Sequence, residues 1–171
     1  DTMTYLTYKT TGIPKNRVIG MGGALDSARF KYRLSEALDC PSSDISAMVI
    51  GGHSDKGMVP LTSFATRNSV RVSTLLSNQR LEQVKQDTKV GGATLTSMLG
   101  TSAWYAPGAA VSALVQSIAC DQHKMFPCSV MLDGEYGLSD LAIGVPVILG
   151  KNGIEKIVDI NLSEDDKSQL H

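Results

Sequence analysis

The sequence predicts an α+β fold, and three observations support this prediction. Short apolar runs typical of strands occur first, long patterns with helical spacing occupy the middle, and a hairpin-rich apolar segment precedes a short acidic tail. Because the expected strands and helices occur in separate blocks, their order is that of an α+β protein.

The first predicted elements are a helix and a short strand. Residues 1–12 carry Met3 and Leu6 at helical spacing and end at Gly12, which is a typical helix stop. This helix begins abruptly, without an initiator methionine, which suggests a fragment of a longer protein. An apolar strand ended by glycines is expected around residues 18–21.

A second helix and several short strands follow. Residues 25–38 have apolar side chains near helical spacing, and Pro41 enforces a stop. The apolar run 45–50 predicts a buried strand. Residues 58–72 alternate well enough for one or two further strands, with Asn68–Ser69 as turn residues.

The second half of the chain is expected to contain helices first and strands afterwards. Residues 77–100 and 106–122 show long helical patterns whose small residues would let helices pack closely. Apolar strands are expected over 125–137 and 141–160, the latter with a Lys-Asn-Gly hairpin turn. Ser163 and the acids after it are typical of a helix N-terminus.

Composition and charge limit the class of protein. With 171 residues and 42% hydrophobic content, the chain can form one sizeable globular domain or two small ones. Its 16 basic and 17 acidic residues form no block, so nothing indicates a nucleic-acid or membrane partner. The three cysteines form no Cys-x-x-Cys pair, which favours a reducing cytoplasm, and no apolar run is long enough to predict a membrane span.

A glycine cluster lies between the strand expected at 18–21 and the helix that follows. Gly20, Gly22 and Gly23 resemble the start of a dinucleotide-binding fingerprint, but Leu25 occupies the position of the third glycine. The cluster therefore favours an ordinary strand-to-helix turn over a nucleotide site.

Asp26 and Arg29 lie three residues apart at the start of the second helix, so their side chains share one face. On spacing alone, an intrahelical ion pair near the helix N-terminus is the favoured interpretation. The alternative separates their roles: Asp26 would point at an imidazole, and Arg29 would offer its planar guanidinium to a substrate carboxylate.

His53 follows the apolar run 45–50 in the stretch GGHSD. A lone histidine after a strand is more often structural than catalytic. Together with an aspartate and an arginine at a nearby helix start, however, His53 has the parts of a general acid–base with an orienting carboxylate. No two histidines have metal-ligand spacing, so no metal site is predicted.

Several motifs together resemble the lactate/malate dehydrogenase family. They are GIPKNRVIGMGGALDSARFKYRLSEAL, GGHSDKGMVPL, WYAPGAA and the segment from LDGEYG to DDKSQL, which together span nearly the whole chain. The similarity is to the C-terminal half of the family, in particular to its lactate-dehydrogenase-like bacterial malate dehydrogenases. The Asp-Ser-Ala-Arg and Gly-Gly-His-x-Asp motifs occur in the order and spacing of that family.

The resemblance assigns roles to particular residues. It implies that His53 is the catalytic histidine, that Asp26 orients it, and that Arg29 binds a substrate carboxylate. A small residue, Ser102 or Ala103, would line the substrate pocket.

Two further positions in GGHSD bear on substrate and local geometry. Members acting on lactate usually have glutamate at the position of Gly52, so this glycine favours malate. Ser54 stands where the family usually has glycine, which raises the question whether the backbone there requires positive φ.

The resemblance also implies a domain organisation. Residues 1–22 would be the last helix and strand of a Rossmann nucleotide-binding domain, and 23–171 the catalytic domain, built on a twisted antiparallel sheet with packed helices. NAD would be bound mainly by an N-terminal half not included in this chain, with a substrate-contacting asparagine just before Asp1. Malate and oxaloacetate are the implied substrates, and a homodimer or homotetramer the implied assembly.

The function predicted in this way is that of the catalytic half of an NAD-dependent malate dehydrogenase. The 171-residue chain alone is expected to have no turnover. Two alternatives remain: the same domain acting on lactate or another 2-hydroxy acid, and a truncated, non-catalytic module that persists as an oligomer.

Overall fold

The computed structural model describes residues 1–170, and its larger sheet is organised around one long strand, β7. One edge of β7 pairs with β6 along almost its whole length. The other edge is shared by β8 and, through the single pair Gly144–Gly51, by β2, on which β3 adds the last strand. All of these pairings are antiparallel. The strands are β2 (Val49–Gly51), β3 (Met58–Pro60), β6 (Lys124–Asp133), β7 (Ser139–Gly150) and β8 (Gly153–Ile157).

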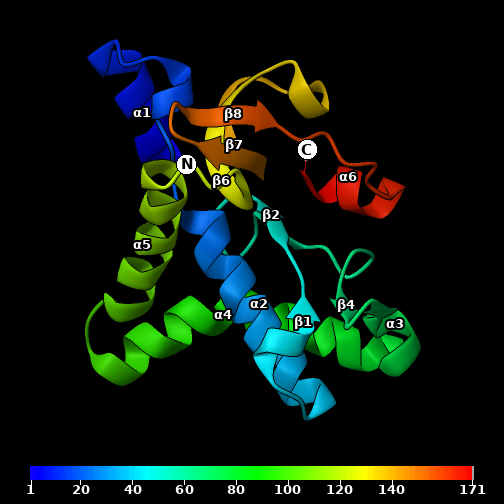
Figure 1. Ribbon diagram of the computed structural model, residues 1–171. Coiled ribbons are helices and arrows are strands. Elements are labelled where there is room, and N and C mark those ends of the chain that lie inside the picture. Colours follow the sequence, from blue (N-terminus) through cyan, green and yellow to red (C-terminus); the bar gives the residue numbers. More distant parts are fainter. Residues whose placement is uncertain (171) are drawn as a thin grey trace.

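Three long helices flank this sheet. The central helix α2 (Gly22–Leu38) packs against β6, β2 and the long helix α4 (Asn78–Leu99). Figure 1 shows α5 (Tyr105–Ala119) at one side of α2, while β4 (Thr66–Arg67) and α3 (Val72–Leu75) lie at the opposite side. The helices predicted over 77–100 and 106–122 are confirmed as α4 and α5. They do not pack mainly on each other, because α4 packs on α2 and α5 packs on β7.

The apolar run 45–50 does not form the single strand that was predicted. It divides into β1 (Ile45–Ser46), which pairs with β4 (Thr66–Arg67), and β2, which pairs with β3. The prediction was wrong because the two ends of the run pair with different sheets. The small sheet is completed by β5 (Val70–Arg71), and the predicted turn Asn68–Ser69 joins it to β4 with positive φ at both residues.

The strand predicted at 18–21 is also absent from the structure. Gly20 forms one isolated antiparallel bridge with Ser129, in which each amide donates to the other carbonyl at 2.8 Å. The chain turns into α2 at Gly22 directly afterwards, so no room is left for a longer ladder. A single helical turn, η1 (Lys15–Arg17), precedes the bridge.

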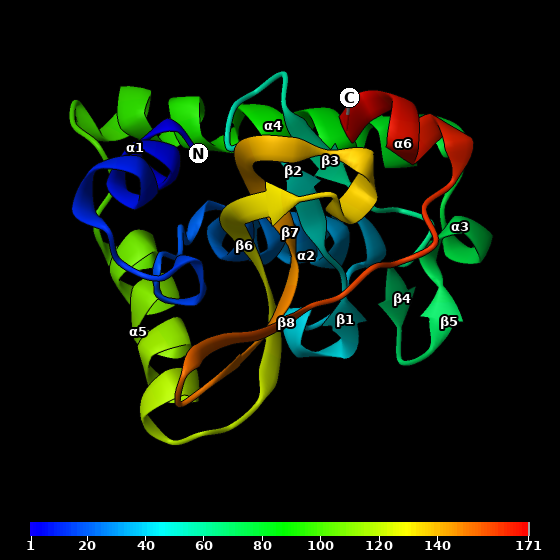
Figure 2. The same cartoon turned by 90° about the horizontal axis from the view of Figure 1, so that it is seen from above.

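The N-terminal helix is confirmed as α1 (Thr2–Thr11), and it ends at Gly12 with φ of 68°. It packs on β6 and β7 (Figure 2). At the far end of the helix, the Lys9 ammonium lies 2.6 Å from the Asp140 carboxylate at the start of β7. Residues 1–22 are therefore attached to the sheet.

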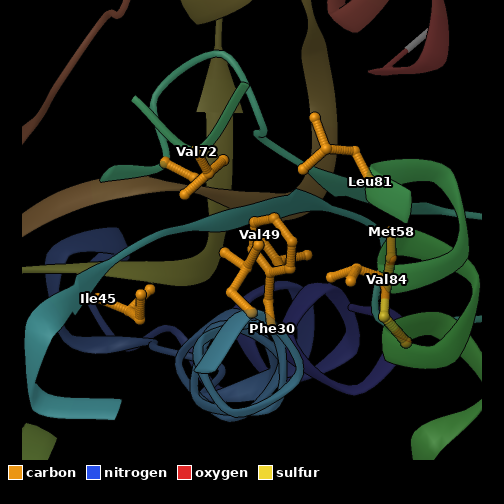
Figure 3. Close-up of a cluster of buried hydrophobic side chains, with 9 residues drawn as sticks. Phe30, Ile45, Val49, Met58, Val72, Leu81 and Val84 are labelled. Atoms are coloured by element: carbon orange, nitrogen blue, oxygen red, sulfur yellow. The ribbon is translucent and has the colours of Figure 1, made fainter. Parts of the chain in front are cut away.

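A buried cluster joins α2 to β2 and α4. Phe30 and Leu34 of α2 are fully buried, and Figure 3 shows Phe30 against Val49 of β2, with Val84 of α4 beside them. Burying a side chain of this size contributes about 1.5–3 kcal/mol. This packing holds α2 in a fixed position relative to β2 and α4.

The C-terminal segment covers the free side of β2 and β3. The hairpin predicted around Lys-Asn-Gly is confirmed by the β7–β8 pairing, with Gly153 at φ of 95°. The last helix, α6 (Glu164–Leu170), is capped as predicted, because the Asp166 amide donates to the Ser163 hydroxyl oxygen at 3.1 Å.

No helix within residues 1–170 is both long and apolar enough to cross a membrane. Two further single turns are η2 (Ser42–Asp44) and η3 (Glu135–Gly137).

Candidate active site

The site is built where the start of α2 meets the end of β2. Asp26 lies in the second turn of α2, and His53 follows the last residue of β2 by two positions. A hydrogen bond joins the two elements: the Val49 amide donates to the buried Ser27 hydroxyl oxygen at 2.8 Å. Since Ser27 is next to Asp26, this bond sets the position of the strand end relative to the carboxylate.

Asp26 and His53 form the central pair of the site. Asp26 Oδ2 lies 2.6 Å from His53 Nδ1, and the side chains are 2% and 40% exposed, respectively. With Asp26 ionised, Nδ1 carries the ring proton and donates it to Oδ2, so that Nε2 is left as an acceptor. No group within the described part of the chain bonds to Nε2. The imidazole is thus oriented from its buried side while its other nitrogen remains available.

Arg29 uses the second oxygen of the same carboxylate. Its Nη1 donates to Asp26 Oδ1 at 3.1 Å, and its side chain is 21% exposed. The guanidinium lies against α4 at Gly92, where an added Cβ would come within 3.2 Å of Nη1. The ion pair expected from the Asp26–Arg29 spacing is therefore present, and Asp26 also points at an imidazole, as the alternative interpretation expected; the binding of a substrate carboxylate by Arg29 stays a prediction.

The glycine cluster serves close packing around this pair. A Cβ on Gly22 would lie 2.7 Å from His53 Cγ, and one on Gly23 would lie 2.8 Å from the Pro127 carbonyl oxygen. The predicted strand-to-helix turn is present, although only a single bridge precedes it. What the spacing of the glycines did not indicate is that the histidine ring occupies the space above Gly22.

The loop that carries His53 is a tight turn. The Ser54 amide donates to the Gly52 carbonyl at 2.8 Å, and the Ser54 hydroxyl accepts from the Gly57 amide at 3.0 Å. Ser54 does not have positive φ, whereas Gly51 does, with φ of 88°. Serine at position 54 therefore imposes no backbone strain, and the residue that needs to be glycine is Gly51.

The two residues expected to line the substrate pocket lie elsewhere. Ser102 and Ala103 are in the loop between α4 and α5, the first exposed and the second half-buried. No hydrogen bond in the described structure links either of them to His53, Asp26 or Arg29. Their role in substrate binding stays a prediction.

A groove of about 400 Å³ runs between α2, α4 and α5, and Arg29 forms part of its wall. Its remaining lining is mostly apolar and includes Leu25, Leu95 and Met98. A second hollow, of about 510 Å³, lies between η3 and α6, and none of the predicted site residues lines it. The candidate chemistry is therefore associated with the α2–α4 side of the molecule.

Three residues that the sequence analysis did not single out for the site, together with Gly22 of the predicted strand-to-helix turn, contribute to its geometry. Gly22 and Gly92 leave room for the imidazole and the guanidinium, and Ser27 joins α2 to β2. Asp1 accepts a hydrogen bond from the His53 amide. The Asp-Ser-Ala-Arg motif contains Ser27 and the glycine cluster contains Gly22, but the contacts of all four residues join positions far apart in the chain and gave no sequence signal.

Comparisons with known proteins identify relatives over nearly the whole chain. A family model described as the lactate/malate dehydrogenase alpha/beta C-terminal domain matches residues 23–171. A malate dehydrogenase of Bacteroides fragilis is 64% identical over 170 residues, covering 99% of this chain and 54% of the relative. One from Flavobacterium johnsoniae is 63% identical over 168 residues, 98% of this chain and 54% of the relative. The chain thus spans about half the length of the curated relatives it matches.

Solved structures agree with the observed fold. The malate dehydrogenase of Cryptosporidium parvum matches with a TM-score of 0.96 at 41% identity, over 99% of this chain and 56% of that one. That of Salinibacter ruber matches with a TM-score of 0.95 at 44% identity, over 99% and 55%. The mixed helical and antiparallel architecture described above is therefore the architecture of this part of those enzymes.

Proposed function

Because the chain belongs to the lactate/malate dehydrogenase family, we propose that it is the substrate-binding and catalytic part of an NAD-dependent malate dehydrogenase. The observation that carries this proposal is the cluster of two side chains around one buried carboxylate, with Asp26 at 2.6 Å from His53 and 3.1 Å from Arg29. An imidazole, an orienting carboxylate and a cation are the groups that oxidation of a 2-hydroxy acid requires from a protein.

His53 acts as the general base. Its Nε2 accepts the proton of the malate C2 hydroxyl, and in the reverse direction the imidazolium returns a proton to the carbonyl oxygen of oxaloacetate. Asp26, held in a buried position beneath the ring, stabilises the imidazolium and keeps Nδ1 protonated. NAD, when bound, supplies the acceptor for the hydride from C2.

Arg29 binds a substrate carboxylate. One of its terminal nitrogens already donates to Asp26, and the residue lines the groove between α2 and α4. A guanidinium presents several N–H donors in one plane, so it can form two parallel hydrogen bonds with a carboxylate. Asp26 then has a double role, since the same buried carboxylate orients both the base and the carboxylate-binding group.

Malate is the proposed substrate rather than lactate. Gly52 precedes His53 where members acting on lactate usually have glutamate, and the high-identity relatives named above are malate dehydrogenases. A pure protein containing this chain together with a nucleotide-binding half should reduce oxaloacetate with NADH much faster than pyruvate. A preference for pyruvate would contradict the proposed substrate.

The dinucleotide is proposed to bind mainly to residues outside this chain. The glycine cluster does not fit a pyrophosphate, because Gly22 and Gly23 are already packed against His53 and the Pro127 carbonyl. We accordingly retain the division into residues 1–22, as the end of a nucleotide-binding domain, and 23–171 as the catalytic domain. Hydride transfer needs both reactants held in near-attack geometry. The purified 171-residue chain is thus expected to show no malate-dependent reduction of NAD, and measurable turnover would contradict this division.

A homodimer or homotetramer is the proposed assembly. Large apolar side chains are exposed on α4, on α5 and between them, and a groove lined by residues of α2, α4 and α5 is mostly apolar; exposed apolar surface is typical of interaction sites. Sedimentation analysis of the protein that carries both halves should give a mass of two or four subunits. The exposed apolar residues on this face include Met98, Leu99, Trp104, Tyr105, Val111 and Val115.

A cytoplasmic location is proposed from the three cysteines, all of which are free thiols.

A further inference from the structure

Asp1 occupies the N-cap position of α1 but does not cap its own helix. An aspartate in this position ordinarily accepts a hydrogen bond from an amide in the first turn of its helix, and here it accepts none. Its Oδ2 instead accepts a hydrogen bond from the His53 backbone amide, at 2.6 Å and across 52 positions of sequence. The Asp1 side chain therefore bonds to the residue proposed as the base and not to its own helix.

The Asp1 carboxylate is directed at this contact. Its other oxygen, Oδ1, is buried, and no donor within residues 1–170 reaches it. A hydrogen bond to an ionised acceptor is shorter and stronger than one between neutral groups. The bond to the His53 amide is thus the principal hydrogen bond of this carboxylate in the described structure.

His53 is consequently held at two points by carboxylates from two helices. Asp26 of α2 binds the ring at Nδ1, and Asp1 at the start of α1 binds the backbone nitrogen of the same residue. The other bonds of the loop, such as the Gly52 amide to the Gly57 carbonyl at 2.9 Å, are internal to it and would move with it. Fixing both the backbone and the ring limits rotation of the side chain about its Cα–Cβ bond.

We infer that Asp1 is a positioning residue for His53: its carboxylate anchors the backbone of the base so that Nε2 is presented to the substrate in one orientation. This inference rests on the proposed function. It assigns to the N-cap residue of α1 a part in the chemistry, because Asp1 itself bonds to the His53 backbone.

The test uses three variants of the protein that carries this chain and its nucleotide-binding half. Asp1→Ala removes the acceptor, Asp1→Asn keeps an acceptor oxygen without the charge, and Asp140→Asn is the matched control. Asp140→Asn weakens the attachment of α1 through Lys9 without touching His53, and Asn tolerates the φ of 56° found at position 140. Rates are normalised to the concentration of NADH-binding sites, so that loss of folded protein does not count as loss of kcat.

We expect Asp1→Ala to lower kcat by about tenfold with KM for malate changed by less than about twofold, because Arg29 keeps its place on α2. Asp1→Asn should recover part of this loss, and Asp140→Asn should leave kcat unchanged. With ¹⁵N-histidine labelling, the His53 amide proton should move upfield in Asp1→Ala and stay in place in Asp140→Asn.

An unchanged kcat in Asp1→Ala, or an equal loss in Asp140→Asn, would overturn the inference. A wild-type protein that neither binds NADH nor oxidises malate would instead refute the proposed function, so the two failures are distinguishable. An Asp1→Asn variant no more active than Asp1→Ala, with the His53 amide unmoved in both, would also remove Asp1 from the positioning of the base.

Discussion

The junction of α2 with β2 and the outer face of α4 and α5 are built in opposite ways. At the junction, polar groups are buried and paired: Asp26 binds His53 and Arg29, and Ser27 binds Val49. On the outer face, large apolar groups are exposed, among them Tyr105 at 86%. The difference supports both proposals made above: the Asp26–His53 pair is already oriented within this chain, whereas the apolar face around the groove is left exposed in it.

The largest expected effect concerns the base itself. In the protein that contains both halves, His53→Asn should lower kcat by roughly 10²-fold to 10⁴-fold, because asparagine cannot exchange a proton with the substrate hydroxyl. Affinity for NADH, measured by fluorescence titration, should remain nearly unchanged. A small loss of kcat would remove His53 from the mechanism and with it the contrast between the two regions.

Stability should differ between the regions in the same sense. Phe30→Ala on the buried face of α2 should lower the free energy of unfolding by about 3–5 kcal/mol, because it opens a cavity in a closed cluster. Val115→Ala on α5, where the valine is 56% exposed, should cost about 0.5 kcal/mol or less. Urea unfolding of the 171-residue chain measures both. Equal costs would show that the face of α5 is already packed in this chain.

Two glycine-to-alanine variants, one in each region, compare the regions by their effect on kcat. Gly22→Ala would place a Cβ 2.7 Å from His53 Cγ, so the ring must shift, and kcat should fall by about tenfold to a hundredfold. Gly108→Ala on α5 would meet no atom within 4 Å and should leave kcat unchanged while slightly stabilising the helix. Steady-state kinetics and thermal unfolding of both variants test this, and an active Gly22→Ala enzyme would mean that the ring position is not critical.

The smallest effect is expected from the cysteines. Burial raises the pKa of the Cys128 thiol, on β6, to about 12, so it should stay unreactive towards a thiol reagent at neutral pH until the protein unfolds. Cys120 at the end of α5 is exposed and should react quickly. Mass spectrometry after brief labelling tells the two apart. Early labelling of Cys128 would show that β6 opens readily.

The sequence predicted those parts of the fold that depend on neighbouring residues. Helical spacing located α2, α4 and α5, Gly12 and Ser163 located helix ends, and the Lys-Asn-Gly turn located the β7–β8 hairpin. It failed at the apolar run 45–50, because an apolar run indicates burial but does not say which partner strand each end selects.

The sequence predicted the candidate site about as far as it predicted the fold. Spacing alone left Asp26 and Arg29 as an ion pair and His53 as a structural histidine, and the family resemblance was needed to prefer the catalytic interpretation. The structure brings these three residues together, while Ser102 and Ala103 show no described hydrogen bond to them.

By itself, then, the sequence determined the residue types of the proposed proton-transfer site and the periodicity of the helix that carries Asp26 and Arg29. Only the tertiary structure decided that one carboxylate serves both His53 and Arg29, that Gly22 makes room for the imidazole, and that Asp1 reaches the His53 amide. The physical reason is one of range. Helix periodicity and turn preference act over a few residues, whereas the contacts that hold His53 join it to Asp26 and Asp1, which lie 27 and 52 positions away in the chain.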